Sequence, residues 1–171
     1  MKLIHNYYHI NTKTKKNKLI RELTISQDYC KSMHNRSKKD NRRRIKGYLT
    51  NNKNIKLLVI TKYMENKQWI DKGSGHLTYE TYNNTPCYFI YDLCRAVKPK
   101  YIKNKKERIS PIKYVIDEFT FFVKKLNINE IFLKISKKND TNKLLMIYNS
   151  YNFHKIEETD DFIILKKNIN N

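Results

Sequence analysis

The sequence predicts a single α/β (α+β) domain, residues 1–171, in which helices flank a mixed, mostly antiparallel central sheet. Two observations carry this prediction. Short runs of apolar, β-branched residues separated by polar turns fill residues 55–97, which is typical of consecutive strands. The last third of the chain, Ile112–Lys167, then alternates between apolar residues at helical spacing and short apolar runs of strand length. A chain of 171 residues is long enough to bury one core.

Residues 1–54 are expected to form an N-terminal strand and a basic helical region. Lys2–Ile10 is rich in Ile, Tyr and His and predicts the strand. Lys15–Tyr48 carries apolar residues at a partly helical spacing, and Gly47 is expected to stop a helix. The basic block Arg36–Lys46 has two interpretations, which are a solvated helix face and a nucleic-acid contact.

Residues 55–97 predict a meander of three strands. The first is Ile55–Ile60, and a turn is expected at Gly73–Gly75. The alternating segment His76–Tyr82 predicts the second strand, and Asn83–Pro86 marks the next turn. Cys87–Val97 is the third strand, and it is apolar enough to be central.

Residues 98–171 predict a helix, a strand, a helix and a strand. Pro111 suits the first turn of the long helix and Ser110 its N-cap, and apolar residues follow at helical spacing to Leu126. Ile131–Ile135 and Phe162–Leu165 predict the strands. The second helix, capped by Asp140 or Thr141, is expected to direct inward Leu144, Leu145, Ile147 and Tyr148.

The net charge of +20 predicts salt-sensitive attraction to nucleic acid or other polyanions. A lysine-rich solvated surface is the alternative, because the composition is also skewed in a way that an AT-rich genome explains. Lys, Asn, Ile and Tyr are abundant, while Ala96 is the only alanine. A large DNA virus is one source of such a composition, so a virion component is among the hypotheses.

Several classes of protein are not indicated. No apolar run approaches the roughly 20 residues that span a bilayer, and the N-terminus has no signal-peptide pattern. The three cysteines are widely spaced and have no His cluster, so we expect neither a disulfide framework nor a metal site. An intracellular protein is therefore expected, located in the host cytoplasm, the nucleus or the virion if it is viral.

The strongest motif lies near the C-terminus. The strand Ile131–Ile135 is followed by Asn139, by a helix ending in Tyr148, by the Asn152–Phe153 turn and by a closing strand. This arrangement resembles the GNAT superfamily of N-acetyltransferases, with Asn152–Phe153 at the position of a Gly-Phe turn. Asn can replace Gly there because it also tolerates the left-handed conformation that a helix C-terminus requires.

The resemblance implies a function and a set of site residues. It implies that acetyl-CoA is the cosubstrate and that an amine is the acceptor. It also implies that the binding site is the gap between the central strand and the strand after the long helix. Main-chain amides of the central strand would bind the pantetheine arm, the start of the long helix would bind the pyrophosphate, and Tyr148 would protonate the departing thiolate. The implied cofactor-binding residues are Leu93, Cys94, Arg95, Val97, Ser110 and Asn139.

The segment that corresponds to the family's glycine-rich pyrophosphate loop departs from the pattern. Tyr101–Pro111 contains no glycine, and Pro111 removes an amide donor. Side-chain charge could replace the amide cradle, in which case the phosphates are bound by Lys103, Lys105, Lys106 and Arg108. Alternatively the cofactor site has decayed, leaving a non-catalytic basic protein that binds nucleic acid or other protein subunits.

The general base is assigned to Glu80, on a strand that faces the substrate side in this family. Asp92 and His76 are further candidates for the same role. Cys94 is interpreted as a core cysteine and not as a nucleophile, because no His lies near it in the sequence.

Overall fold

The computed structural model describes residues 2–8, 55–66, 68–97, 110–138 and 140–169, and single helical positions at 17, 20, 39, 40, 42, 43, 46 and 47. The elements are β1 (Lys2–Tyr8), β2 (Ile55–Glu65), β3 (Gln68–Tyr82), β4 (Thr85–Val97), α3 (Pro111–Lys125), β5 (Glu130–Ser136), α4 (Thr141–Asn149), β6 (His154–Glu158) and β7 (Phe162–Asn168). Among the described residues, no helix is long and apolar enough to cross a membrane.

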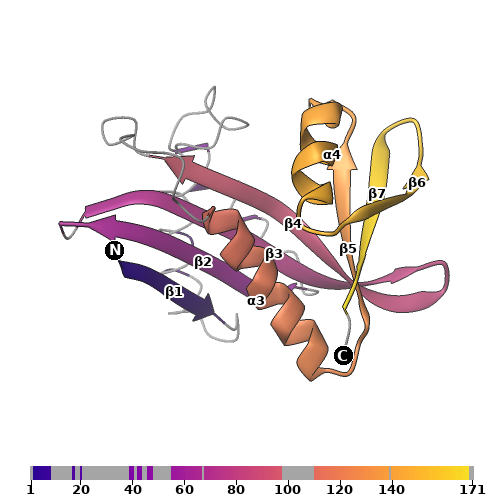
Figure 1. Cartoon of the computed structure of the whole chain (residues 1–171), viewed down its shortest axis with the longest axis horizontal. Helices are drawn as coiled ribbons and strands as arrows, with labels where there is room; N and C mark the ends of the chain where they lie inside the picture. Colours follow the sequence, from indigo (N-terminus) through magenta and orange to yellow (C-terminus); the bar gives the residue numbers. More distant parts are fainter. Residues whose placement is uncertain are drawn as a thin grey trace.

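One seven-stranded sheet contains every strand described, in the order β1-β2-β3-β4-β5-β7-β6. All neighbouring strands are antiparallel except β4 and β5, which are parallel. A parallel pair needs a crossover, and α3 supplies it. Figure 1 shows α3 crossing the sheet and α4 beside β5. The predicted mixed, mostly antiparallel sheet with flanking helices is therefore confirmed.

Asparagines in the left-handed conformation make the hairpin turns. Asn66 has a φ of 48° between β2 and β3, and Asn83 and Asn84 have φ values of 48° and 62° between β3 and β4. Asn adopts this conformation more readily than most residues, which suits tight hairpins. The turn expected at Asn83–Pro86 is confirmed at its two asparagines, while Thr85 and Pro86 already belong to β4.

The turn expected at Gly73–Gly75 is wrong, because β3 runs straight through this segment. The glycines are needed for close packing instead. A Cβ at Gly73 would lie 2.8 Å from the backbone carbon of Pro111, and a Cβ at Gly75 would lie 2.9 Å from Cδ2 of Leu93. The first turn of α3 therefore rests on the backbone of β3.

α3 is fixed to the sheet at its start and along one face. The Thr61 hydroxyl of β2 donates a buried hydrogen bond of 3.0 Å to the Pro111 carbonyl. Four apolar residues at helical spacing are almost fully buried against the sheet, namely Val115, Ile116, Phe119 and Val123. They share one core with inward residues of β2 to β5, β7 and the end of α4.

The C-terminal elements confirm the prediction in one place, extend it in a second and correct it in a third. Asp140 caps α4 as expected, accepting a 3.3 Å bond from the Lys143 amide. β6 was not predicted, because this edge strand is mostly exposed and lacks an apolar alternation. Ile147 was expected to point inward but is 38% exposed, since α4 directs only Tyr148 fully into the core.

The N-terminal region is described at few positions. β1 pairs with β2 as a strand, as predicted. The single positions described in residues 15–48 are helical, as predicted, and Gly47 is one of them. The residue that follows Gly47 lies outside the described part of the chain. The predicted helix stop therefore stays a prediction.

Gly73→Ala is expected to lower the free energy of unfolding by about 1–3 kcal/mol, because the new methyl group meets helix backbone that cannot rotate away. Urea denaturation followed by circular dichroism measures the change. Gly47→Ala is the matched control: nothing lies within 4 Å of its Cβ position, so it should be neutral or stabilise by up to about 1 kcal/mol. Equal midpoints for Gly73→Ala and the unmodified protein would contradict this account of the contact.

Candidate active site

β4 and β5 are joined at only two positions and then part. Their register contains Phe89 with Phe132 and Ile90 with Leu133. Beyond Ile90, β4 continues to Val97 against β3 alone, and β5 continues against β7 alone. The two strands diverge in Figure 1, with α4 on the β5 side. Tyr91–Val97 therefore has no partner on β5 within the described register.

A β-bulge lies in β4 where the strands part. His76 pairs with Tyr91 and Ser74 with Cys94, so two residues of β4, Asp92 and Leu93, face Gly75 alone. A bulge bends its strand and increases the local twist, which is consistent with β4 leaving β5 at this point. The Leu93 side chain occupies the space above Gly75, near the α3 core.

The start of α3 lies close to the unpaired edge of β4. Gly73 pairs with Arg95 in β4 and touches Pro111 in α3, which places the helix start one strand away from this edge. Ser110 occupies the N-cap position, but its side chain makes no capping hydrogen bond, and the first turn has no acidic residue. Backbone N–H groups require partners, and a helix start favours an anion, so the two features together suit a polar, anionic ligand.

Tyr148 has a buried hydroxyl at the end of α4. The residue is 9% exposed, and its ring packs edge-on against Phe153 with centroids 6.3 Å apart. Burial, followed by the nearby Tyr151, raises the pKa of Tyr148 to about 12. No described residue makes a hydrogen bond with the Tyr148 hydroxyl. A buried donor without an acceptor is costly, so a ligand atom would satisfy it.

The turn after α4 has the conformation expected from its sequence. Asn152 has a φ of 65°, and the Phe153 amide donates a 3.1 Å bond to the Tyr148 carbonyl. Phe153 is completely buried. The turn therefore fixes the end of α4, and with it the position of the Tyr148 ring.

Glu80 lies on the opposite face of the sheet from Tyr148. Its carboxylate accepts bonds from the Thr78 hydroxyl at 2.8 Å and from the Tyr91 hydroxyl at 3.2 Å. His76 is buried and stacks on Tyr91, with centroids 5.7 Å apart. The structure thus places Glu80 and His76 together around Tyr91, and it does not bring either of them to Tyr148. The side chain of Asp92 lies outside what is described.

The cysteines differ from expectation in one respect. Cys94 is buried, which confirms its interpretation as a core cysteine, but it is disulfide-bonded, which was not expected, and it therefore offers no thiol for catalysis. Cys87 is a free buried cysteine, and burial, with the Glu80 carboxylate second, raises the pKa of its thiol to about 11. A thiol with this pKa stays protonated and unreactive at neutral pH.

Some of the remaining predicted site residues lie on β4, and the others lie outside the described part of the chain. Leu93, Arg95 and Val97 lie on the parted segment of β4, and only the Arg95 side chain is exposed among those described there. The basic segment with Lys103, Lys105, Lys106 and Arg108 lies outside the described residues, as does Asn139. In the described part of the chain, no group of His, Cys, Asp or Glu side chains could hold a metal ion.

Sequence reasoning missed the residues that shape the site. Tyr91 is one of them, and its position directly after the last pair with β5 becomes visible only in the register. Gly75 is another, and its role depends on Leu93 from a neighbouring strand. Gly73 and Gly75, which were interpreted as a turn, were the available signal, because glycine inside a strand often marks a bulge or a close approach.

Comparison with known proteins gives the fold. No protein-family model matches the sequence, and comparison with curated protein sequences finds no match. Solved structures are similar over nearly the whole chain. The PaiA N-acetyltransferase of Thermoplasma acidophilum, in complex with coenzyme A, is 17% identical, covers 98% of this chain and 99% of its own, and has a TM-score of 0.57.

Two further acetyltransferases show the same similarity. The ribosomal-protein-S18-alanine N-acetyltransferase of Escherichia coli is 13% identical, with coverage of 97% and 94% and a TM-score of 0.53. A GNAT-family acetyltransferase of Streptococcus pneumoniae is 11% identical, with coverage of 99% and 100% and a TM-score of 0.51. The chain therefore has the GNAT acetyltransferase fold, and the resemblance drawn from its C-terminal motif is confirmed at the level of the fold.

Tyr148 is expected to ionise about two pH units above an ordinary tyrosine, since its pKa is raised from 10.0 to about 12. The folded state holds this proton more tightly than the unfolded state, so the associated stability is complete below pH 10 and is lost as the pH rises through 12. The difference in tyrosinate absorbance between the unmodified protein and Tyr148→Phe isolates this residue. A difference curve with its midpoint near 10 would contradict the buried position.

Proposed function

We propose that this protein is an acyl-CoA-dependent N-acyltransferase that transfers an acetyl group from acetyl-CoA to an amine. The observation that carries the proposal is the parting of β4 from β5 after two residue pairs. A scaffold without a ligand between these strands would gain hydrogen bonds by pairing them further. The unpaired edge of β4 instead offers main-chain groups to a pantetheine arm.

The chemistry requires a proton for the departing sulfur. The amine nitrogen attacks the thioester carbonyl, the tetrahedral intermediate collapses, and the C–S bond breaks to release the CoA thiolate. We assign Tyr148 as the donor of the hydrogen bond and proton to this sulfur, since its hydroxyl is buried and has no described partner. The raised pKa keeps the proton on Tyr148 at neutral pH until negative charge develops beside it.

The amine must reach the thioester as a free base. Glu80 is proposed to accept its proton from the face of the sheet opposite Tyr148. Hydrogen bonds from Thr78 and Tyr91 fix the carboxylate, and Tyr91 is the first residue of β4 beyond its pairing with β5. With the acid Tyr148 and the base Glu80 on opposite faces of the sheet, the space between β4 and β5 would be available to the thioester.

The phosphates of CoA are proposed to bind the basic segment before α3. The fold relative from Thermoplasma acidophilum is in complex with coenzyme A. In this chain the equivalent segment lacks glycine, so we assign phosphate binding to Lys103, Lys105, Lys106 and Arg108, with the start of α3 at Ser110. In this arrangement charged side chains bind the phosphates, in place of the backbone amides of glycine residues.

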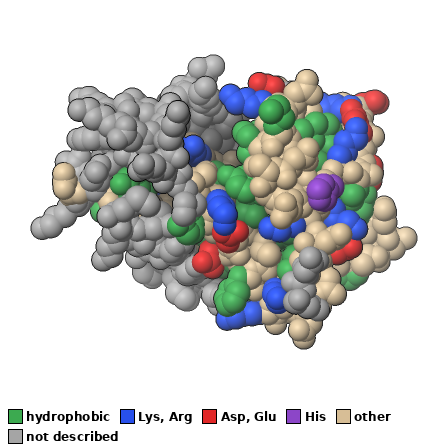
Figure 2. Space-filling model, viewed as in Figure 1, with side chains coloured by type: hydrophobic (Ala, Val, Ile, Leu, Met, Phe, Trp, Pro, Cys, Tyr) green, Lys and Arg blue, Asp and Glu red, His purple; other side chains and the backbone are tan. Residues whose placement is uncertain are grey.

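The alternative, a non-catalytic basic protein on the same scaffold, rests on net charge. On the face shown in Figure 2, Lys and Arg side chains of the described residues are interspersed with acidic and hydrophobic ones. Exposed acidic residues are paired with lysines elsewhere in the described part of the chain as well, as in Lys113–Asp117 and Lys137–Glu158, both at 2.6 Å. The parted strands support the catalytic proposal over this alternative.

Replacing three basic residues, as Lys103→Gln, Lys105→Gln and Arg108→Gln together, is expected to weaken CoA binding by about tenfold or more. Hydrogen bonds to charged groups contribute about 1.5–3 kcal/mol each, and 1.4 kcal/mol corresponds to tenfold. Isothermal titration calorimetry measures the affinity. Pantetheine lacks phosphates, so its binding should not change.

The matched control removes three positive charges elsewhere, as Lys124→Gln, Lys125→Gln and Lys138→Gln, at exposed positions. This variant should retain CoA affinity at 150 mM salt. Absence of CoA binding to the unmodified protein at millimolar concentration would sink the proposed function. An equal loss in both triple variants would contradict the assignment of the phosphate site.

Tyr148→Phe is expected to lower kcat by about 100-fold, because general acid catalysis contributes about 10²–10⁴-fold. CoA affinity should change little, since the hydroxyl acts on the departing sulfur. Acetyl transfer from acetyl-CoA to a panel of primary amines, followed by thiol release, measures the rate. Tyr151→Phe is the control on the neighbouring half-buried tyrosine, and a Tyr148→Phe rate within threefold of the control would contradict the role of Tyr148.

A further inference from the structure

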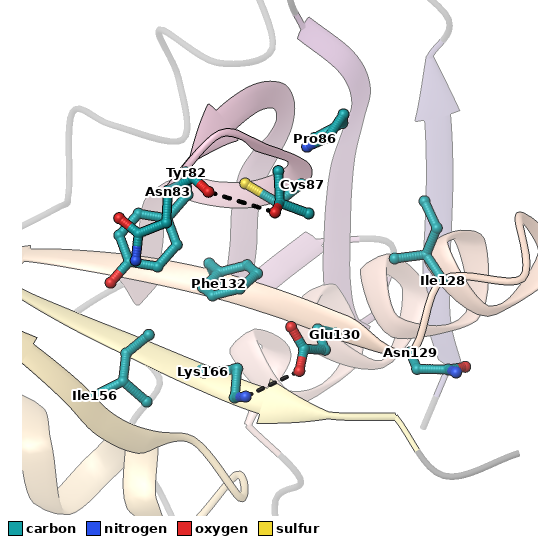
Figure 3. Close-up of a pocket in the computed structure, with 11 residues that line it drawn as sticks. Tyr82, Asn83, Pro86, Cys87, Ile128, Asn129, Glu130, Phe132, Ile156 and Lys166 are labelled. Carbon is teal, nitrogen blue, oxygen red and sulfur yellow. Dashed lines mark hydrogen bonds and ion pairs between the residues drawn. The ribbon is translucent and has the colours of Figure 1, made fainter.

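A pocket of about 360 Å³ lies on the face of the sheet that carries Glu80. Figure 3 shows it between the β3–β4 turn, the start of β5 and the strands β6 and β7. Cys87 and Phe132 line the pocket and belong to the apolar cluster of that face, and Cys87 pairs with Glu80 in the register of β3 and β4. Residues opposite each other in a ladder share a face, so the pocket and the proposed base lie on the same side of the sheet.

Cys87 lies between the pocket and Glu80. Its thiol donates to the main-chain oxygen of Glu80 at 3.7 Å. Burial raises the pKa of this thiol to about 11, and the Glu80 and Glu130 carboxylates both add to the rise, so Cys87 is near the base and near a carboxylate of the lining. Glu80 and Tyr82 are two residues apart on one face of β3, which is about 7 Å along the strand. A molecule with one end at Glu80 therefore reaches the pocket with a stem of about this length.

A row of aromatic rings connects the same two places. The Tyr82 ring lines the pocket and packs edge-on against Phe89, with centroids 6.1 Å apart. Phe89 packs in turn against Tyr91, also at 6.1 Å, and the Tyr91 hydroxyl donates to the Glu80 carboxylate. Tyr82 and Tyr91 are both half-buried, so their rings offer an apolar surface between the pocket and the base.

The wall of the pocket is fixed by a contact between distant parts of the chain. The Tyr82 hydroxyl donates to the Glu157 carboxylate of β6, 75 residues away in the sequence, and this bond holds the hairpin beside the C-terminal strands. The accessible apolar lining comes from Pro86, Ile128 and Ile156, of which Ile156 is 42% exposed. A ligand would therefore meet apolar side chains from three separate segments.

The charges of the lining neutralise each other. Among the described residues that line the pocket, only Glu130 and Lys166 are charged, and they form an ion pair at 2.9 Å. The asparagines and the threonine of the lining are uncharged. A charged ligand group would lose its water without finding an unpaired opposite charge in this lining, which costs free energy. An uncharged, apolar group suits the pocket better.

We propose that this pocket binds an uncharged, apolar group of the amine acceptor while the reactive nitrogen lies at Glu80. The inference names the substrate class of the proposed acyltransferase and rests on that proposed function. The acceptor is a primary amine joined to an aliphatic or aromatic group that extends about 7 Å from the nitrogen, without a second charge at its far end. A free alkylamine and the apolar N-terminal residue of a peptide present the same chemistry.

The first test compares acceptors in acetyl transfer from acetyl-CoA by the full chain. n-Hexylamine is expected to have a kcat/KM about tenfold above that of ethylamine, because burial of one methylene group contributes roughly fourfold and about two more enter the pocket. 1,6-Diaminohexane and 6-aminohexanoate carry a charge at the end of the same stem, so they should be used no better than ethylamine. Leucylglycinamide against glycylglycinamide shows whether a peptide N-terminus supplies the apolar group.

The second test changes the lining. Ile156→Gln is expected to lower the ratio of the hexylamine and ethylamine kcat/KM values by about threefold, because an apolar contact of the stem is lost. Ile147→Gln is the matched control, since Ile147 of α4 is exposed to a similar extent, 38%, and does not line the pocket. The control should keep the ratio of the unmodified protein.

The third test needs no catalysis. The full chain with ¹³C-labelled isoleucine methyl groups is titrated with n-hexanol, which has the stem but no amine, and followed by NMR. The methyl signals of Ile128 and Ile156 should shift and saturate, because both residues line the pocket, while those of Ile116 in the α3 core should not. Hexanoate should cause no saturable shift.

Several results would overturn the inference. These are equal kcat/KM values for ethylamine and n-hexylamine, a value for 1,6-diaminohexane or 6-aminohexanoate equal to that of n-hexylamine, and equal effects of Ile156→Gln and Ile147→Gln. Hexanol shifts at Ile116 equal to those at Ile156 would do the same. If acetyl is transferred without any preference for the longer stem, the pocket assignment fails and the acyltransferase stands. If no amine is acetylated although hexanol binds at Ile156, the acyltransferase proposal fails and the pocket for an uncharged group stands.

Discussion

The short contact between β4 and β5 is the constraint on which the rest of the structure depends. Two residue pairs join the antiparallel β1–β4 half of the sheet to the β5–β7–β6 half. A parallel pair cannot be closed by a tight turn, so the chain crosses over through α3, whose apolar face then covers both sides of the contact. The same contact sets where β4 becomes free, and therefore where a ligand could use its main-chain groups.

The close fit between β3 and its neighbours maintains this geometry. Gly75 leaves room for Leu93 at the bulge, and Gly73 leaves room for the start of α3. Either side chain would separate elements that the site needs together. The two faces of the sheet consequently differ: the face under α3 and α4 is an apolar core that contains Tyr148, and the other carries Glu80, Tyr91 and an aromatic cluster around Phe89.

The sequence predicted the elements whose signals are local. The long helix follows from Pro111 and from apolar residues at helical spacing, and the left-handed Asn152 follows from its place between a helix end and Phe153. Pattern alone also suggested Tyr148, because its spacing places it on the inward side of α4. These features depend on residues within one or two turns of each other.

The features that were missed depend on residues far apart in the chain. Gly73 and Gly75 predict a turn when only the neighbouring sequence is considered. In the fold they lie within a strand, where they leave room for Pro111 and Leu93. β6 has no apolar alternation because an exposed edge strand has no buried face. The pocket beside Tyr82 combines the hairpin, the start of β5 and β6–β7, and no single segment of sequence indicates it.

Backbone hydrogen exchange with and without CoA tests the central claim most directly. In the free protein, amides of Tyr91–Val97 that point away from β3 should exchange fast, while Phe89 and Ile90 at the contact with β5 are protected. Saturating CoA should slow exchange in Tyr91–Val97 and leave β1 and β2 unchanged. Exchange in Tyr91–Val97 that is already slow without CoA, or that CoA does not alter, would contradict a cofactor site at the parted strands.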